Sequence, residues 1–270
     1  MDPKDLLVHL DSSPRAAERL GVAVALARRF GARLTGLFAE SAILGSSLVG
    51  RRSPENLARA AADARARFEA ACEGVPTRFW QLEPSEHAEV VGWAVVCCRH
   101  VDLAVLGQRQ GDDAPVPEGL VEQVIAGSGR PVLVIPSAGR FSDVGKRVVV
   151  AWSGSRESTR ALHDALPLLR GAESVTLLSL QLPKEGTAQG GLPPLDVLEH
   201  LRAHGVEARY DRWLVTDLAA VDAVLNRASD EAADLTVIGA FGLVGGPRLK
   251  APETTRQILE TMTTPVLLSC

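Results

Sequence analysis

The sequence has little of several residue types that mark particular classes of protein. Aromatic residues make up only 4% of the 270, with a single tyrosine, and the 29 basic residues do not outnumber the 33 acidic ones. A formal net charge of −4 gives no attraction for nucleic acid or for an anionic membrane surface. No apolar run approaches the roughly 18–20 residues that span a bilayer, and we expect no signal peptide. The sequence therefore predicts a protein that binds neither polynucleotides nor membranes.

Cysteine is also scarce. Cys72, Cys97, Cys98 and Cys270 show no CxxC or Cys/His spacing, so neither a zinc site nor a disulfide framework is indicated. We expect reduced thiols in a cytoplasmic protein. The content of 46% hydrophobic and 23% charged residues is ordinary for a folded globular chain and too apolar for a disordered one.

An internal repeat is the most informative feature that is present. Residues 102–107 (DLAVLG) recur as 234–239 (DLTVIG), and residues 131–135 (PVLVI) recur as 265–269 (PVLLS). Two matching segments in the same order, at nearly the same spacing, indicate a duplicated unit of roughly 130–140 residues.

The duplication sets the domain boundaries. We expect one domain over residues 1–138 and a second over residues 144–270. The linker is predicted at 139–143, which is short, polar and preceded by a serine-alanine pair.

Each copy alternates short apolar runs, typical of buried parallel strands, with longer amphipathic segments, typical of helices. Ser13 is expected to cap the first helix, with Pro14 at its first position. Strands are predicted at 5–10, 33–38, 78–82, 102–106, 132–135, 147–152, 174–180, 206–211, 235–238 and 266–269. Helices are predicted at 13–30, 54–72, 85–99, 117–126, 155–169, 192–204, 217–232 and 253–262. The pattern predicts an α/β fold: two tandem, doubly wound domains, each with a five-stranded parallel sheet.

Sheets of this kind bind ligands at the carboxyl ends of their strands, where the strand order reverses. The turn at 11–13, the DLxVxG strand and the closing PVLxx strand resemble those of the universal stress proteins, over essentially the whole chain. The resemblance implies a tandem member with an adenine-nucleotide alpha-hydrolase-like fold. It also implies that the closing strands 132–135 and 266–269 pair, so that the two halves pack as an intramolecular pseudo-dimer. A homodimer remains an alternative.

The second copy keeps part of the motif with which members of that family bind ATP. Those members carry Gly-x2-Gly-x9-Gly-[Ser/Thr] after the fourth strand, where backbone N–H groups and a helix end hold phosphates. Gly239 and Gly242 supply the first half of this motif. Pro252 and Glu253 stand where the resemblance implies Gly and Ser/Thr. Proline lacks an N–H donor and the carboxylate repels phosphate, so this site is predicted to be degenerate.

The first copy departs from the motif in another way. Gly107 is present and Gly119 falls in the second half of the motif, but the loop between them is shorter and carries Asp112 and Asp113, with Glu118 at its end. Arg109 is the one cation that the loop sequence sets against them. The resemblance implies a further contact from the residue that ends the first strand. That residue is Asp11 in the first copy and Ser153 in the second.

The candidate cofactor-binding residues are therefore Asp11, Gly107, Gly119, Gly239 and Gly242, and neither half carries the whole set. We expect a universal stress protein that acts by binding or interaction and not by catalysis. No cofactor is certain. An ATP- or AMP-binding sensor with one functional site, with or without slow ATP hydrolysis, is the alternative.

Two other patterns each have a functional and a structural interpretation. Residues 153–158 weakly resemble the loop of pyrophosphate-splitting adenylating enzymes, but an N-cap serine at Ser155 explains them better. His200 and His204 are four residues apart on an expected helix and could ligate a metal ion together. Glu199 and Arg202 beside them favour a solvated face, so no metal site is predicted.

Overall fold

The structure is a computed structural model that describes residues 1–42, 52–82, 87–109, 111, 115–181, 196–214, 220–240 and 253–270. The chain divides into two compact units, Met1–Asp143 and Val144–Cys270. Within the described ranges no helix is both long and apolar enough to cross a membrane.

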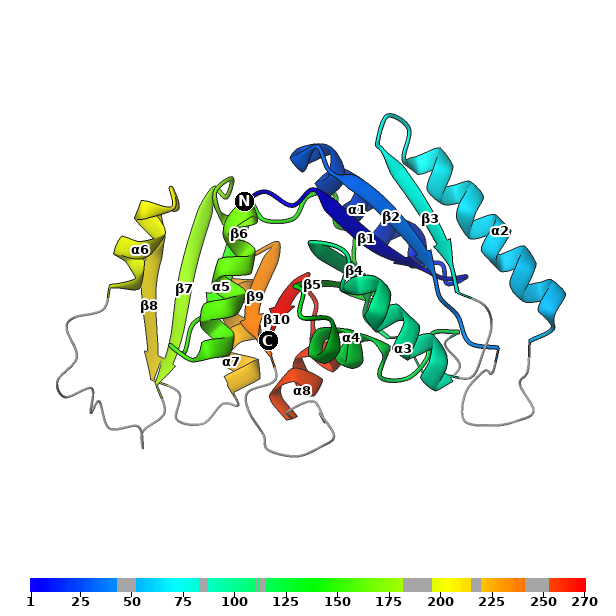
Figure 1. The fold of residues 1–270 in the computed structure, drawn as a ribbon. Coiled ribbons are helices and arrows are strands. Elements are labelled where there is room, and N and C mark those ends of the chain that lie inside the picture. The colour runs from blue at the N-terminus through cyan, green and yellow to red at the C-terminus, as the bar shows by residue number, and fades with distance from the viewer. Residues whose placement is uncertain are drawn as a thin grey trace. The chain divides into compact units, whose positions relative to one another are not determined.

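Among its described residues, the first unit has five parallel strands and four helices, which Figure 1 labels. Its strand order is β3-β2-β1-β4-β5, and α1 contacts α2 while α3 contacts α4. In chain order the elements are β1 (Asp5–Leu10), α1 (Ala16–Phe30), β2 (Arg33–Phe38), α2 (Pro54–Ala71), β3 (Thr77–Gln81), α3 (His87–Cys98), β4 (Leu103–Gly107), α4 (Leu120–Ser128) and β5 (Val132–Ile135).

The second unit repeats the same order, β8-β7-β6-β9-β10. Its elements are β6 (Arg147–Ala151), α5 (Arg156–Leu169), β7 (Ser174–Gln181), α6 (Val197–Ala203), β8 (Arg209–Leu214), α7 (Ala220–Asp230), β9 (Leu235–Gly239), α8 (Glu253–Thr261) and β10 (Val266–Ser269). The prediction of two tandem, doubly wound, five-stranded α/β domains is confirmed.

Burial explains why these short apolar runs are strands. In β1 the side chains of Leu6, Leu7 and Val8 are all 0% exposed, and β5 is buried along its whole length. A strand that is covered on both faces loses contact with water at every position, so its sequence is continuously apolar instead of alternating. The same holds for β10 in the second unit.

The aspartate of the repeated DLxVxG segment has the same structural role in each unit. Asp102 Oδ2 accepts hydrogen bonds from the backbone N–H groups of Lys4 (2.8 Å) and Asp5 (3.1 Å), at the start of β1. Asp234 Oδ1 accepts them from Gly145 (2.8 Å) and Lys146 (2.9 Å), before β6. Each aspartate thus satisfies otherwise open donors where the first strand of its unit enters the sheet.

The structure corrects the start of the first helix. The helix begins at Ala16, and its N-cap is Arg15, which makes no capping side-chain hydrogen bond. Ser13 was predicted to be the cap, but its backbone N–H donates to Asp11 Oδ1 at 2.8 Å in a turn that precedes the helix. β8 likewise begins at Arg209, three residues later than predicted. The other boundaries differ by a few residues where they are described.

Candidate functional site

A cavity of about 410 Å³ lies in the first unit, where β1 and β4 end. These two strands are neighbours, with Leu6 opposite Leu103, and the strand order reverses between them. Asp11 and Gly107, two of the candidate residues, line this cavity. Its volume lies in the range of small-molecule sites, and its position is where parallel α/β sheets bind ligands.

Asp11 is held by a buried arginine that the sequence did not single out. Arg19 on α1 is 3% exposed, and its Nη2 donates to Asp11 Oδ2 at 2.8 Å. Its Nε donates to the carbonyl oxygen of His9 at 2.6 Å. Burial alone would raise the pKa of Asp11, but the Arg19 guanidinium, helped by hydrogen bonds from the Ser13 side chain and N–H, outweighs burial and lowers that pKa to about 2. Asp11 is therefore an ionised carboxylate already engaged by the protein.

Gly107 is a glycine because of the same arginine. A Cβ atom built at Gly107 would lie 2.1 Å from Arg19 Nη1, closer than any non-bonded contact. The guanidinium occupies the space beside the end of β4, so an alanine here would displace it from Asp11. The close backbone approach that Gly107 permits is thus made by a side chain of the protein itself.

Arg15 and Arg109 also line the cavity. Arg15 is anchored by its Nη2, which donates to Pro136 O at 2.9 Å, and by its Nη1, which donates to Gly139 O at 2.8 Å. With Arg19 there are three guanidinium groups and one carboxylate among the described lining residues. Arg15 and Arg19 come from α1 and the turn before it, so the cavity has two cations besides Arg109 from the loop. Asp112 and Asp113 lie outside the described residues.

His9 lies in the wall of the cavity and is kept neutral. Its Nε2 is 2.8 Å from the carbonyl oxygen of Ala39, which can only accept, so Nε2 carries the proton. Nδ1 then faces Asp11 Oδ2 at 3.8 Å. Burial, followed by the charge of Arg19, lowers the pKa of His9 below its usual value. Nothing in the sequence marks His9 as a cavity residue, because it lies inside a buried strand.

Gly119 occupies the N-cap position of α4 and is not among the lining residues. Its φ is 76°, in the left-handed region, and nothing lies within 4 Å of where a Cβ would be. Backbone conformation therefore accounts for this glycine without a ligand.

In the second unit a serine cluster replaces the aspartate. Ser153 Oγ lies 3.1 Å from Ser155 Oγ and 3.2 Å from Ser158 Oγ. Ser155 Oγ accepts from the backbone N–H of Ser158 at 3.2 Å, so the prediction that it is the N-cap of α5 is confirmed. The loop that weakly resembles an adenylating enzyme is a helix start whose hydroxyls bind one another.

Gly239 is fixed by backbone packing. A Cβ here would lie 2.5 Å from the carbonyl carbon of Glu157 and 2.5 Å from the amide nitrogen of Ser158. Gly239 lines a cavity of about 230 Å³ together with Thr254 and Thr255, and most of its other lining residues are aliphatic. No charged side chain is among those described lining residues.

The rest of the second nucleotide motif is described only at its end. Gly242 and Pro252, together with Arg248 and Lys250, lie outside the described residues. Glu253 begins α8, where its two carboxylate oxygens are each 2.7 Å from Arg256 Nη2. The helix end that would receive phosphate thus carries a carboxylate paired with its own helix.

The sequence matches no protein-family model and no curated protein. Solved structures do match over nearly the whole chain. A universal stress protein from Archaeoglobus fulgidus is 16% identical with a TM-score of 0.73, covering 98% of this chain and 97% of that one. A functionally unknown protein from Pseudomonas aeruginosa is 16% identical with a TM-score of 0.62, covering 99% and 92%.

A third structure, a putative universal stress protein from Pseudomonas aeruginosa, is 17% identical with a TM-score of 0.59, and it covers 99% of this chain and 93% of that one. At these identities the likeness concerns the fold. Over its full length, the chain has the fold of the universal stress proteins.

Proposed function

We propose that the chain is a cytoplasmic tandem universal stress protein that acts by binding and not by catalysis, with nucleotide sites that have become degenerate in both halves. The observation that carries this proposal is the position of the Arg19 guanidinium group. This guanidinium holds Asp11 at 2.8 Å and fills the space beside Gly107. Two groups that the resemblance implies for nucleotide are thereby committed to an internal ion pair.

The second half supports the same proposal by other means. Ser153 replaces the aspartate, and the α5 backbone fills the space beside Gly239. Glu253 adds negative charge at the start of α8, which disfavours an anion there.

The described lining of the first cavity also favours binding over turnover. His9 is its one imidazole, and its proton is directed at a backbone carbonyl while burial holds its pKa down. A histidine whose pKa is lowered by burial is a weaker base than a solvent-exposed one. The Ser13 side chain hydrogen-bonds Asp11, but that carboxylate is already paired with Arg19, which makes it a poor base for activating a hydroxyl.

One observation favours a second candidate, a sensor that binds AMP or ATP in the first half only. Arg15 and Arg109 line the 410 Å³ cavity, and their guanidinium groups would attract an anionic ligand and donate hydrogen bonds to it. Arg15 is already oriented by two backbone carbonyls, so little side-chain entropy would be lost on binding.

Calorimetric titration of the full chain with ATP, ADP and AMP tests both candidates. The degenerate-site proposal predicts no binding at micromolar or lower dissociation constants. Binding of one nucleotide per chain, weakened by Arg109→Ala and unchanged by Arg67→Ala on the exposed side of α2, would overturn it in favour of the sensor. Release of phosphate or pyrophosphate at a steady rate would overturn the proposal of a non-enzyme.

A further inference from the structure

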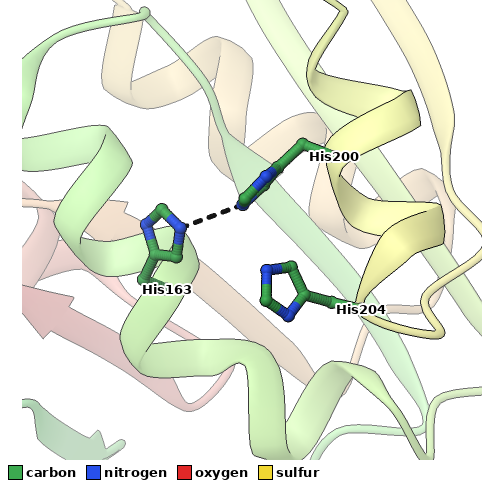
Figure 2. A group of neighbouring side chains, drawn as sticks. All are labelled: His163, His200 and His204. Carbon is green, nitrogen blue, oxygen red and sulfur yellow. Dashed lines mark hydrogen bonds between the residues drawn. The ribbon is translucent and has the colours of Figure 1, made fainter.

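Three histidines from two helices of the second unit meet at one point (Figure 2). His163 comes from α5, while His200 and His204 come from α6 and its C-cap. One ring nitrogen from each lies within 4.8 Å of the others. His163 Nε2 and His200 Nε2 are 3.0 Å apart, and the ring of His204 stands 4.7 Å from that of His200.

Helix α6, which carries two of these rings, is fixed by hydrogen bonds at both of its ends. Asp196 caps its start by accepting from the backbone N–H groups of Leu198 (2.8 Å) and Glu199 (3.2 Å). At its other end, Arg170 Nε donates to the carbonyl oxygen of His204 at 3.2 Å and ties the end of α6 to the end of α5. His200 and His204 are one helical turn apart, so they face α5 together.

A hydrogen bond orients the His163 ring. Its Nδ1 is 3.0 Å from the carbonyl oxygen of Thr159, one turn earlier on α5. A carbonyl only accepts, so Nδ1 carries the proton and Nε2 keeps its lone pair, directed at His200. Histidines that ligate metal ions are oriented in this way, with the second ring nitrogen donating to a carbonyl or carboxylate.

The short distance between the two Nε2 atoms excludes an arrangement in which both present a lone pair to each other. Two lone pairs 3.0 Å apart repel, so the contact needs either a proton on His200 Nε2 or a cation that both nitrogens bind. With Zn–N bonds of about 2.0–2.1 Å, ligand nitrogens in a tetrahedral site lie about 3.3–3.4 Å apart. The Nε2 atoms of His163 and His200 are already near that spacing, and the His204 nitrogen, within 4.8 Å of both, would move closer on binding.

We propose that His163, His200 and His204 form a binding site for a divalent transition-metal ion, with Zn²⁺ as the preferred occupant. Imidazole nitrogen suits Zn²⁺, Ni²⁺ and Cu²⁺, whereas Mg²⁺ and Ca²⁺ require oxygen ligands. Within the described part of the chain, the group contains neither a carboxylate nor a thiol. The chemistry of the donors therefore selects against the two abundant hard cations.

The site would leave at least one coordination position to the solvent side. His163 and His200 also line a cavity of about 860 Å³, with Ser153, Tyr210 and Arg212 among its other walls. Three histidine ligands and one exchangeable position are the arrangement of zinc sites that bind water or a small ligand.

The expectation of a solvated face at His200 and His204 rested on the two neighbours in sequence, Glu199 and Arg202. His163 could not be added from the sequence, because it lies 37 residues before His200 and only the packing of α5 against α6 joins them.

Calorimetric titration of the chelator-treated full chain with Zn²⁺ tests the site. We expect one Zn²⁺ per chain and no response to Mg²⁺. Loss of a partner that only orients a ligand costs about 10–100-fold in affinity, so His163→Gln should weaken Zn²⁺ binding by at least about 100-fold. His204→Gln should act similarly, and His100→Gln, an exposed histidine outside the cluster, should change nothing.

X-ray absorption of the zinc-loaded protein identifies the ligands independently. Three imidazole nitrogens with no sulfur would support the site, and circular dichroism of His163→Gln would verify that the variant is folded. The proposal is overturned if the wild-type chain takes up less than one equivalent, if His163→Gln and His204→Gln both bind as tightly as wild type, or if sulfur from a cysteine is found in the shell. None of these results depends on whether the first half binds a nucleotide.

Discussion

Replacing Arg19 by methionine removes the cation that stabilises the buried Asp11 carboxylate. Asp11 is 2% exposed, and its carboxylate would keep only the hydrogen bonds from Ser13, through that residue's side chain and backbone N–H. Breaking a buried pair by removing one partner costs about 3–5 kcal/mol, because the remaining charge is left in a low-dielectric site. We expect Arg19→Met to lower the free energy of unfolding at pH 7 by that amount.

The shifted pKa gives a second measure of the same interaction. The pKa of Asp11 falls from 3.8 to about 2 in the fold, which corresponds to about 2 kcal/mol of stability. Because the folded value is the lower one, this stability is present above about pH 4 and is lost as the pH falls through 2. In Arg19→Met only burial would remain large, so the pKa of Asp11 should rise above 3.8. The difference in stability between wild type and variant should therefore shrink as the pH is lowered.

A double-mutant cycle separates this coupling from general damage. Asp11→Asn alone leaves Arg19 buried without its counter-ion, so it should also destabilise, while Asp11→Asn/Arg19→Met should cost at least about 2 kcal/mol less than the two single changes together. Urea unfolding at pH 7 and pH 3 gives the energies. Hydrogen exchange of the amides in β1 assigns them to the first of the two units. If the two single effects add within about 0.5 kcal/mol, the ion pair does not couple these residues and the reasoning fails.

Further predictions concern the two glycines, one thiol and the halves of the chain. Gly107→Ala should destabilise the wild type by about 2–3 kcal/mol in urea unfolding and be nearly neutral in the double variant, where no guanidinium stands in its way. Gly239→Ala should destabilise in every background, because it meets backbone and not a movable side chain; a neutral result would contradict the packing described. Burial raises the pKa of Cys98 to about 12, so alkylation at pH 7.5 followed by mass spectrometry should find it unmodified unless the protein is unfolded. If the closing strands pair as the resemblance implies, a second half expressed separately from a chain divided near Gly139 should dimerise in gel filtration, and a stable monomer would refute the pairing.

The fold could be predicted because the signals for it are local or repeated. A continuous apolar run such as Val132–Ile135 is buried at every position in a sheet that is covered on both faces. The structure places this strand at the residues where the sequence predicts it. The predicted start of α1 was wrong because a serine at position 13 fits two local structures, an N-cap and a preceding turn. As a serine followed by proline it resembles an N-cap, but its N–H is taken by Asp11 in the preceding turn.

The site was harder to predict, because its decisive contacts join residues from different elements. Asp11 and Gly107 were found from the positions where strands end. Arg19 was not, since an arginine on a helix is ordinarily solvated, and only the packing of α1 on the sheet turns it inward. A charged residue on the apolar stripe of α1, between Ala16 and Leu20, was the one signal available.

The ion pair between Asp11 and Arg19 has a consequence for the way such chains diverge. The two residues are eight positions apart, and Gly107 completes the arrangement from another strand, so no one of the three can change freely while the others stay. In a set of aligned relatives we expect these columns to vary together: an arginine in the α1 column should occur with an acid before it and a glycine at the end of β4, and sequences that lose the arginine should tolerate larger residues in the glycine column. Such covariation would distinguish, from sequence alone, tandem chains in which an arginine side chain fills the pocket from chains in which the pocket is open.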